Sequence, residues 1–237
     1  MGFLLIPGYH LPLNLALRTP ISTGLISLIL NLNPAITYFL AVAFRQEPAR
    51  RERTFGVVAA FGGLVLIFGE EILRDLQSGS VVFSWEGAAW MLLPPLSWSV
   101  FTLVGRRIAG RHDARFTFAA TGTAGTTFIL IATPFLLDGQ SGAEFLALEP
   151  LDWVSWAYVS LLAAFFAYWV WILALRHYEA SRLASVGNIV PLVVHLVAVV
   201  FLPEERKALT VAYVIGAVLT LAGTALVVRP DKRPPRR

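Results

Sequence analysis

Residues 31–47 read NLNPAITYFLAVAFRQE, and residues 188–204 read NIVPLVVHLVAVVFLPE. When the two stretches are aligned, six of the 17 positions are identical. The identical pairs are Asn31/Asn188, Pro34/Pro191, Ala41/Ala198, Val42/Val199, Phe44/Phe201 and Glu47/Glu204. Each stretch is largely apolar and carries a proline within the apolar segment. The match indicates an internal duplication in which each copy contributes one helix of the same design.

The chain as a whole is strongly apolar, and this decides the class of protein. Of its 237 residues, 57% are hydrophobic and 14% are charged, against about 45–50% and about 25% in soluble domains. Long apolar runs predict eight membrane helices at roughly 1–17, 20–44, 54–69, 85–105, 115–137, 153–175, 183–203 and 209–228. Most of these runs approach or exceed the ~20 residues that cross a bilayer. The sequence therefore predicts an all-α polytopic membrane protein with about eight transmembrane helices, embedded in the lipid bilayer.

Basic residues fall mainly in alternate connections between these helices. Of the 19 lysines and arginines, all but Arg18, Arg74, Arg206 and Lys207 lie in one set of connections and in the C-terminal tail. The positive-inside rule places that set in the cytoplasm. The sequence thus predicts an integral plasma (inner) membrane protein with both termini cytoplasmic. The basic balance then reflects topology, so we expect no nucleic-acid partner, because no basic face is interleaved with aromatic residues.

The distribution of basic residues also indicates that the two copies have opposite orientations in the bilayer. It places the Glu47 end of the first copy inside and the Glu204 end of the second copy outside. Inversion requires an odd number of helices in each unit. Residues 85–229 supply five helices as a complete second repeat, and residues 1–72 supply three as an incomplete first repeat. Residues 230–237 form a basic cytoplasmic tail. By symmetry, two helices are expected to be missing before Met1.

Further matching segments reinforce this pattern. They are Asn14–Ser22 (NLALRTPIS), Pro34–Glu47 followed by Gly56, Tyr168–Leu175, Ala180–Ala184 (ASRLA), and Pro191–Glu204 followed by Gly216 and Gly223. On these segments the chain resembles the EamA family of the drug/metabolite transporter superfamily. The resemblance implies ten helices in two inverted five-helix repeats, both termini in the cytoplasm, and export or exchange of small metabolites. This chain departs from the family pattern by lacking the first two helices.

Pro34 and Pro191 are the first candidate site residues. A proline within a helix removes one N–H and frees the carbonyl one turn earlier, at Leu30 and Gly187. In hydrocarbon that carbonyl needs a partner or must face a cavity. The matched prolines predict two broken or kinked helices that line a solute path near the midplane, where inverted repeats meet. A kink that serves packing alone is the alternative.

Polar residues accompany both prolines at helical spacing. Asn31, Pro34 and Tyr38 share one helix face, and so do Asn188, Pro191 and His195. Such paired stripes are suited to binding a polar solute, although hydrogen bonding between helices is the alternative. Because every Asp and Glu lies in a loop or at a helix end, we expect His195 to act as a neutral hydrogen-bonding group rather than a proton carrier.

Aromatic residues complete the predicted substrate-binding set. Tyr168 and Trp169, together with Trp98 and Trp171, predict an amphipathic lining, and aromatic filling between helices is the alternative. Asn14, Ser97 and Thr102 are expected to add polar groups to this lining. Glu47 and Glu204, at helix ends, are expected to be structural.

The sequence favours a membrane transporter, an exporter or exchanger of a small polar or amphipathic metabolite that works by alternating access between inverted repeats. A truncated, non-transporting module that pairs with another chain is the alternative. The sequence contains no HExxH, GxSxG, Walker A or GxGxxG motif and no cysteine, so we expect neither an enzyme nor a bound metal or cofactor. The sequence leaves open whether the chain forms a homo-oligomer.

Overall fold

The computed structural model describes residues 1–79, 84–136, 147–202 and 210–230, and all regular structure in these ranges is helical. The helices are α1 (Gly2–Leu5), α2 (Pro7–Leu17), α3 (Thr23–Leu30), α4 (Asn33–Ala43), α5 (Arg51–Ser78), α6 (Trp85–Ala109), α7 (Ala114–Leu136), α9 (Pro150–Tyr158), α10 (Ala167–Leu175), α11 (Ala180–Val186), α12 (Val190–Phe201) and α13 (Val211–Val228). A π-helical stretch, Val159–Phe166, joins α9 to α10.

Within these ranges, seven helices are long and apolar enough to cross a membrane. Gly2–Leu17 adds a shorter apolar helix, which divides into α1 and α2 where Pro7 enters. The arrangement confirms the predicted all-α membrane fold of about eight helices. The largest boundary difference is at α5, which extends beyond the predicted 54–69 to Arg51–Ser78. Charged residues end the apolar run of α5, but the helix continues through them, because charged side chains are well solvated at the membrane–water interface.

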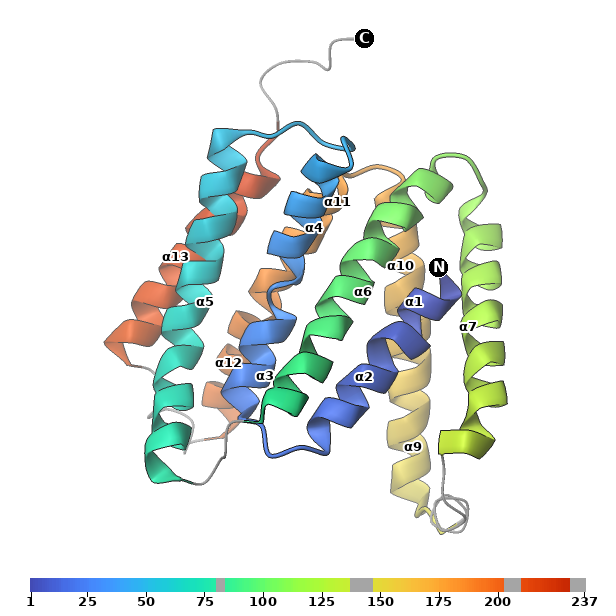
Figure 1. Cartoon of the computed structure of the whole chain (residues 1–237), viewed down its shortest axis with the longest axis horizontal. Helices are drawn as coiled ribbons and strands as arrows, with labels where there is room; N and C mark the ends of the chain where they lie inside the picture. The colour runs from blue at the N-terminus through green and yellow to red at the C-terminus, as the bar shows by residue number, and fades with distance from the viewer. Residues whose placement is uncertain (80–83, 137–146, 203–209, 231–237) are drawn as a thin grey trace.

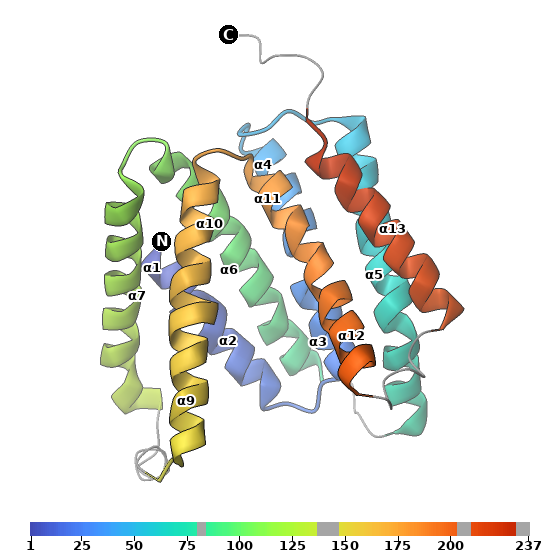
Figure 2. The ribbon, with the colours of Figure 1, turned by 180° about the vertical axis from the view of Figure 1, so that it is seen from behind.

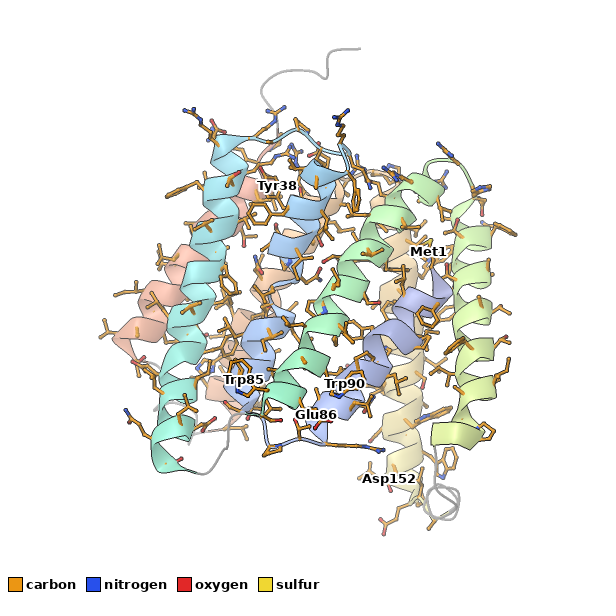
Figure 3. All side chains as sticks on the ribbon, in the orientation of Figure 1. Met1, Tyr38, Trp85, Glu86, Trp90 and Asp152 are labelled. Carbon is orange, nitrogen blue, oxygen red and sulfur yellow. The ribbon has the colours of Figure 1, made fainter. Side chains whose placement is uncertain are left out.

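The helices are arranged in two layers (Figure 1). One layer contains α5, α3–α4, α6 and α1–α2, and the other contains α13, α11–α12 and α9–α10, as the reverse view confirms (Figure 2). The arginine-bearing connections α4–α5, α6–α7 and α10–α11 lie together with the end of α13 at one end of the bundle, here named the arginine-rich end. Trp85, Glu86 and Asp152 lie at the opposite end (Figure 3). Residues 231–237 of the predicted tail, and Glu204, lie outside the described residues.

The segments that match in sequence run in opposite directions. From α3 to α4 the chain rises toward the arginine-rich end, and from α11 to α12 it runs away from that end (Figure 1). The following helices, α5 and α13, are antiparallel neighbours with the most extensive contact in the bundle. The architecture is therefore that of an inverted repeat.

Four glycines allow α5 and α13 to approach closely. A Cβ atom on Gly56 would lie 2.7 Å from the Gly223 carbonyl oxygen, and one on Gly216 would lie 2.5 Å from that of Gly63. Small residues allow such backbone contact between membrane helices. The repeat equates Gly56 with Gly216 and Gly63 with Gly223, so the first glycine of each copy faces the second glycine of the other. A two-fold axis between the copies produces this reciprocal pairing.

We expect Gly63→Ala to destabilise the protein, because a Cβ atom there would lie 2.7 Å from the backbone nitrogen of Thr220. The cost should be about 1–3 kcal/mol, as for other overpacked sites. Gly62→Ala is the matched control, since nothing lies within 4 Å of its Cβ position. Thermal unfolding in detergent measures both variants. Equal melting temperatures would show that the close approach is not required.

Candidate functional site

Both prolines of the repeat lie where a membrane helix is interrupted. α3 ends at Leu30, and Pro34 lies in the first turn of α4. α11 ends at Val186, a 3₁₀ turn follows, and Pro191 lies in the first turn of α12. Each proline lacks the N–H that would continue the helical ladder across the break. At the first break the Asn31 side chain bonds locally, donating from Nδ2 to the Ser27 carbonyl at 2.7 Å.

A cavity of about 660 Å³ lies between the two interruptions. It is lined by Tyr9, Ser27, Leu30, Asn31, Asn33, Pro34, Phe68, Pro95, Trp98, Trp171, Ala184, Gly187, Val190, Pro191, Val194, His195 and Ala198. These residues come from both repeats. The freed backbone of both breaks therefore borders a cavity, which is the setting in which irregular backbone is tolerated at membrane depth.

The described lining of this cavity is uncharged and amphipathic. Its polar groups are hydroxyls, carboxamides, indoles and one imidazole, and none of its residues is Asp, Glu, Lys or Arg. Asn33 is held in place by other residues, because its Oδ1 accepts hydrogen bonds from Thr37 Oγ1 and Ser99 Oγ, each at 3.0 Å. Such a lining suits a solute without net charge, because an unpaired charge would lose its hydration without gaining a partner.

Trp98 is the centre of an aromatic wall on one side of the cavity. Its ring centroid lies 5.7 Å from that of Tyr9 and 5.2 Å from that of Trp171, and all three residues line the cavity. Tyr168 lies behind this wall, with its ring centroid 5.7 Å from that of Trp98 and its hydroxyl 3.2 Å from His10 Nε2. The wall offers a solute flat apolar faces together with N–H and O–H groups.

His195 lies opposite, on α12. Its ring centroid is 4.3 Å from that of Tyr213 on α13. Its Nε2 atom is buried and has no hydrogen-bond partner among the described residues. Those residues also contain no group of three His, Cys, Asp or Glu side chains that could bind a metal ion.

The structure brings together four of the eight predicted site residues, Asn31, Pro34, Pro191 and His195, as cavity lining. Trp98 and Trp171 also line the cavity, whereas Asn14, Ser97 and Thr102 do not. Trp169 lies on another face of α10, with its ring centroid 5.4 Å from that of Phe118 on α7.

Tyr38 and Asn188 lie outside the cavity lining. Tyr38 follows Pro34 by one turn within α4, so this helix face continues beyond the cavity. Tyr38 lies near the arginine-rich end (Figure 3), and its hydroxyl bonds Thr54 Oγ1 at 2.9 Å and the Arg50 carbonyl at 3.2 Å. Asn188 is buried within the 3₁₀ turn.

Sequence reasoning missed Tyr9, Ser27, Asn33 and Phe68 as lining residues. Ser27 carried a usable signal, because it precedes Asn31 by one helical turn and so shares its face. Phe68 carried none, since it resembles every other apolar residue of α5.

A bundle of apolar helices with two inverted, interrupted helices around a solute-sized cavity defines a polytopic membrane protein of the transporter class. The EamA-like transporter family model matches residues 85–229. The chain belongs to this family.

Comparison with known proteins agrees with that assignment. An uncharacterized transporter of Archaeoglobus fulgidus is 29% identical over 179 residues, which cover 75% of this chain and 58% of that protein. A Salmonella typhimurium protein named "probable amino-acid metabolite efflux pump" is 25% identical over 88% of this chain and 68% of its own length. A solved crystal structure aligns with a TM-score of 0.73 at 18% identity, over 95% of this chain and 74% of that one, and shows the same fold.

We expect a cysteine at Ser27 to react with a small, water-soluble thiol reagent, because Ser27 lines the cavity. Ser99→Cys is the matched control, since Ser99 is fully buried and bonded to Asn33. The chain has no native cysteine, so each labelling signal reports a single site. Mass spectrometry after a timed reaction measures both rates. Comparable labelling of the two cysteines would mean that water does not enter as the cavity predicts.

Proposed function

We propose that this protein moves a small, net-neutral, amphipathic metabolite across the membrane by alternating access between two inverted repeats, residues 1–72 and 85–229. One observation carries the proposal: Pro34 and Pro191, equivalent positions of the two repeats, both line a single cavity. Inverted-repeat transporters place their solute site at such a meeting of broken helices.

The chemistry of the lining supports the solute class. The uncharged polar groups around Asn31 and His195 would bond the polar part of a solute, and the wall around Trp98 would cover its apolar part. The name of the Salmonella typhimurium relative, a "probable amino-acid metabolite efflux pump", supports a small metabolite as the solute.

An asymmetry between equivalent helix pairs supports alternating access. α4 packs against α11, and α4 has four buried residues, Pro34, Thr37, Tyr38 and Ala41. The equivalent pair, α12 and α3, has no contact of similar extent, and α12 has no buried residue. One end of the cavity is therefore closed by helix packing that the other end lacks, and exchange of the two arrangements would move the opening from end to end.

We further propose that the arginine-rich end faces the cytoplasm of a plasma (inner) membrane, with both termini on that side, by the positive-inside rule. Outward movement as an exporter or exchanger is consistent with this orientation and with the efflux pump among the relatives.

A second candidate is a membrane module that is completed by a helix from another chain. The exposure of α12 favours it, since none of its residues is buried. Solute counterflow by the purified protein in liposomes, across a panel of neutral amino acids and small amides, separates the candidates. Saturable counterflow supports the transporter, whereas solute binding without flux supports the module.

For the orientation, we expect Gly110→Cys, in the exposed α6–α7 connection, to be labelled in cells only after the membrane is permeabilised. Ala147→Cys, exposed before α9, should be labelled by the same impermeant maleimide in intact cells. The opposite pattern would reverse the proposed topology.

For the site, we expect His195→Gln to retain flux with little change in its pH dependence between about pH 5.5 and 8, because the side chain acts as a neutral hydrogen-bonding group. His195→Leu should weaken solute binding by roughly 0.5–1.5 kcal/mol, the net contribution of one hydrogen bond. His112→Leu, exposed in the α6–α7 connection, is the control. Binding titration and vesicle flux are the measurements. Loss of pH-dependent flux in His195→Gln with binding intact would make His195 a coupling residue instead.

A further inference from the structure

At the arginine-rich end, one buried carboxylate joins the two repeats. Glu47, which follows α4, is only 4% exposed. Its Oε1 accepts a hydrogen bond from the backbone N–H of Ser181 in α11 at 3.1 Å, and its Oε2 accepts one from the Ser181 hydroxyl. The two residues are 134 positions apart, so this contact is a tie between repeats and not a local turn.

A chain of opposite charges extends the tie. Arg53, in the first turn of α5 and 2% exposed, lies 3.4 Å from Glu47 Oε2 and 2.6 Å from Glu179 Oε2. Arg182 lies 2.8 Å from the same oxygen of Glu179. Positive and negative groups therefore alternate from the first repeat into the second. Buried charges are tolerated because each faces an opposite charge or a hydrogen-bond donor.

The tie lies next to a packed contact between α4, α6 and α11. Next to it, Ala41 of α4, Leu103 of α6 and Ala180 of α11 form a fully or almost fully buried cluster. Ala184, one helical turn beyond Ala180, lines the cavity. In the proposed alternating access, α4 and α11 would separate here to let a solute leave toward the arginine-rich end.

We infer that Glu47 is the positioning residue that holds the arginine-rich end closed through Ser181, and that this contact breaks and re-forms once in each transport cycle. The inference rests on the proposed alternating access. The hydrogen bonds between the Glu47 carboxylate and Ser181 can break and re-form. When α4 and α11 part, Glu47 and Ser181 enter water at the edge of the bundle, and hydration replaces the bonds that were lost.

The direct test measures opening, not transport. In the chain carrying Ala184→Cys, an impermeant thiol reagent supplied only at the arginine-rich end of reconstituted vesicles should label slowly. Glu47→Gln, which loses the charge that pairs with Arg53, should raise this labelling rate about tenfold or more. Ser181→Ala should raise it in the same direction. Glu52→Gln, an exposed glutamate five positions on, is the matched control and should leave the rate unchanged.

Only variants that are monodisperse in detergent before reconstitution are labelled. This excludes misfolded protein, so an effect on stability can be told apart from an effect on opening. If Glu47→Gln lowers the melting temperature but labels no faster than Glu52→Gln, Glu47 is a structural tie and the inference is wrong. Faster labelling of both Glu47→Gln and Ser181→Ala supports it.

A second test locks the contact. With Glu47→Cys and Ser181→Cys combined, a short thiol cross-linker should stop flux while solute still binds from the opposite end, and a cleavable linker should restore flux on reduction. The control is each single variant, Glu47→Cys or Ser181→Cys, treated with the same linker. Its flux should be the same before and after treatment. Undiminished flux through the locked Glu47–Ser181 pair overturns the inference. Absence of flux in the protein without substitutions instead refutes the proposed transport function, and the labelling test still decides the role of Glu47.

Discussion

The backbone contact between α5 and α13 is the constraint about which the rest of the molecule is organised. Gly56 faces Gly223 and Gly63 faces Gly216, so the interface maps onto itself under the two-fold relation between the repeats. An interface of this kind would be unchanged if the two repeats exchanged their conformations, as the proposed alternating access requires. The other helices could then rearrange around a fixed α5–α13 pair.

The cavity is a consequence of the missing backbone N–H of two prolines in membrane helices. Without an N–H on Pro34 and Pro191, neither helix continues its hydrogen-bond ladder through the break. Hydrocarbon gives the freed backbone groups no partner, so the breaks must lie against protein or water. They meet in the interior, bordered by Asn31, the Trp98 wall and His195, where polar side chains and water can satisfy them.

The sequence predicted the membrane class, the number of helices and their inversion, because apolar length and arginine placement are read directly from composition along the chain. It also placed Asn31, Pro34, Pro191 and His195 together, because both breaks are marked by proline. It did not show that Tyr38 and Asn188 lie outside the cavity lining, because helical spacing predicts a shared face but not how far along that face a cavity extends. Nor did it reveal the contact of Glu47 with Ser181, because residues 134 positions apart leave no trace in local spacing.

The uncharged lining has a consequence for the energy of transport. Each elementary charge that crosses a potential of 100 mV exchanges about 2.3 kcal/mol with the electric field. The described residues that line the cavity include no Asp, Glu, Lys or Arg for that field to act on. A neutral solute carried in this cavity would then move without regard to membrane voltage and follow its own concentration gradient. If the protein carries such a solute as proposed, the distribution of that solute at equilibrium across the membrane would not depend on membrane voltage.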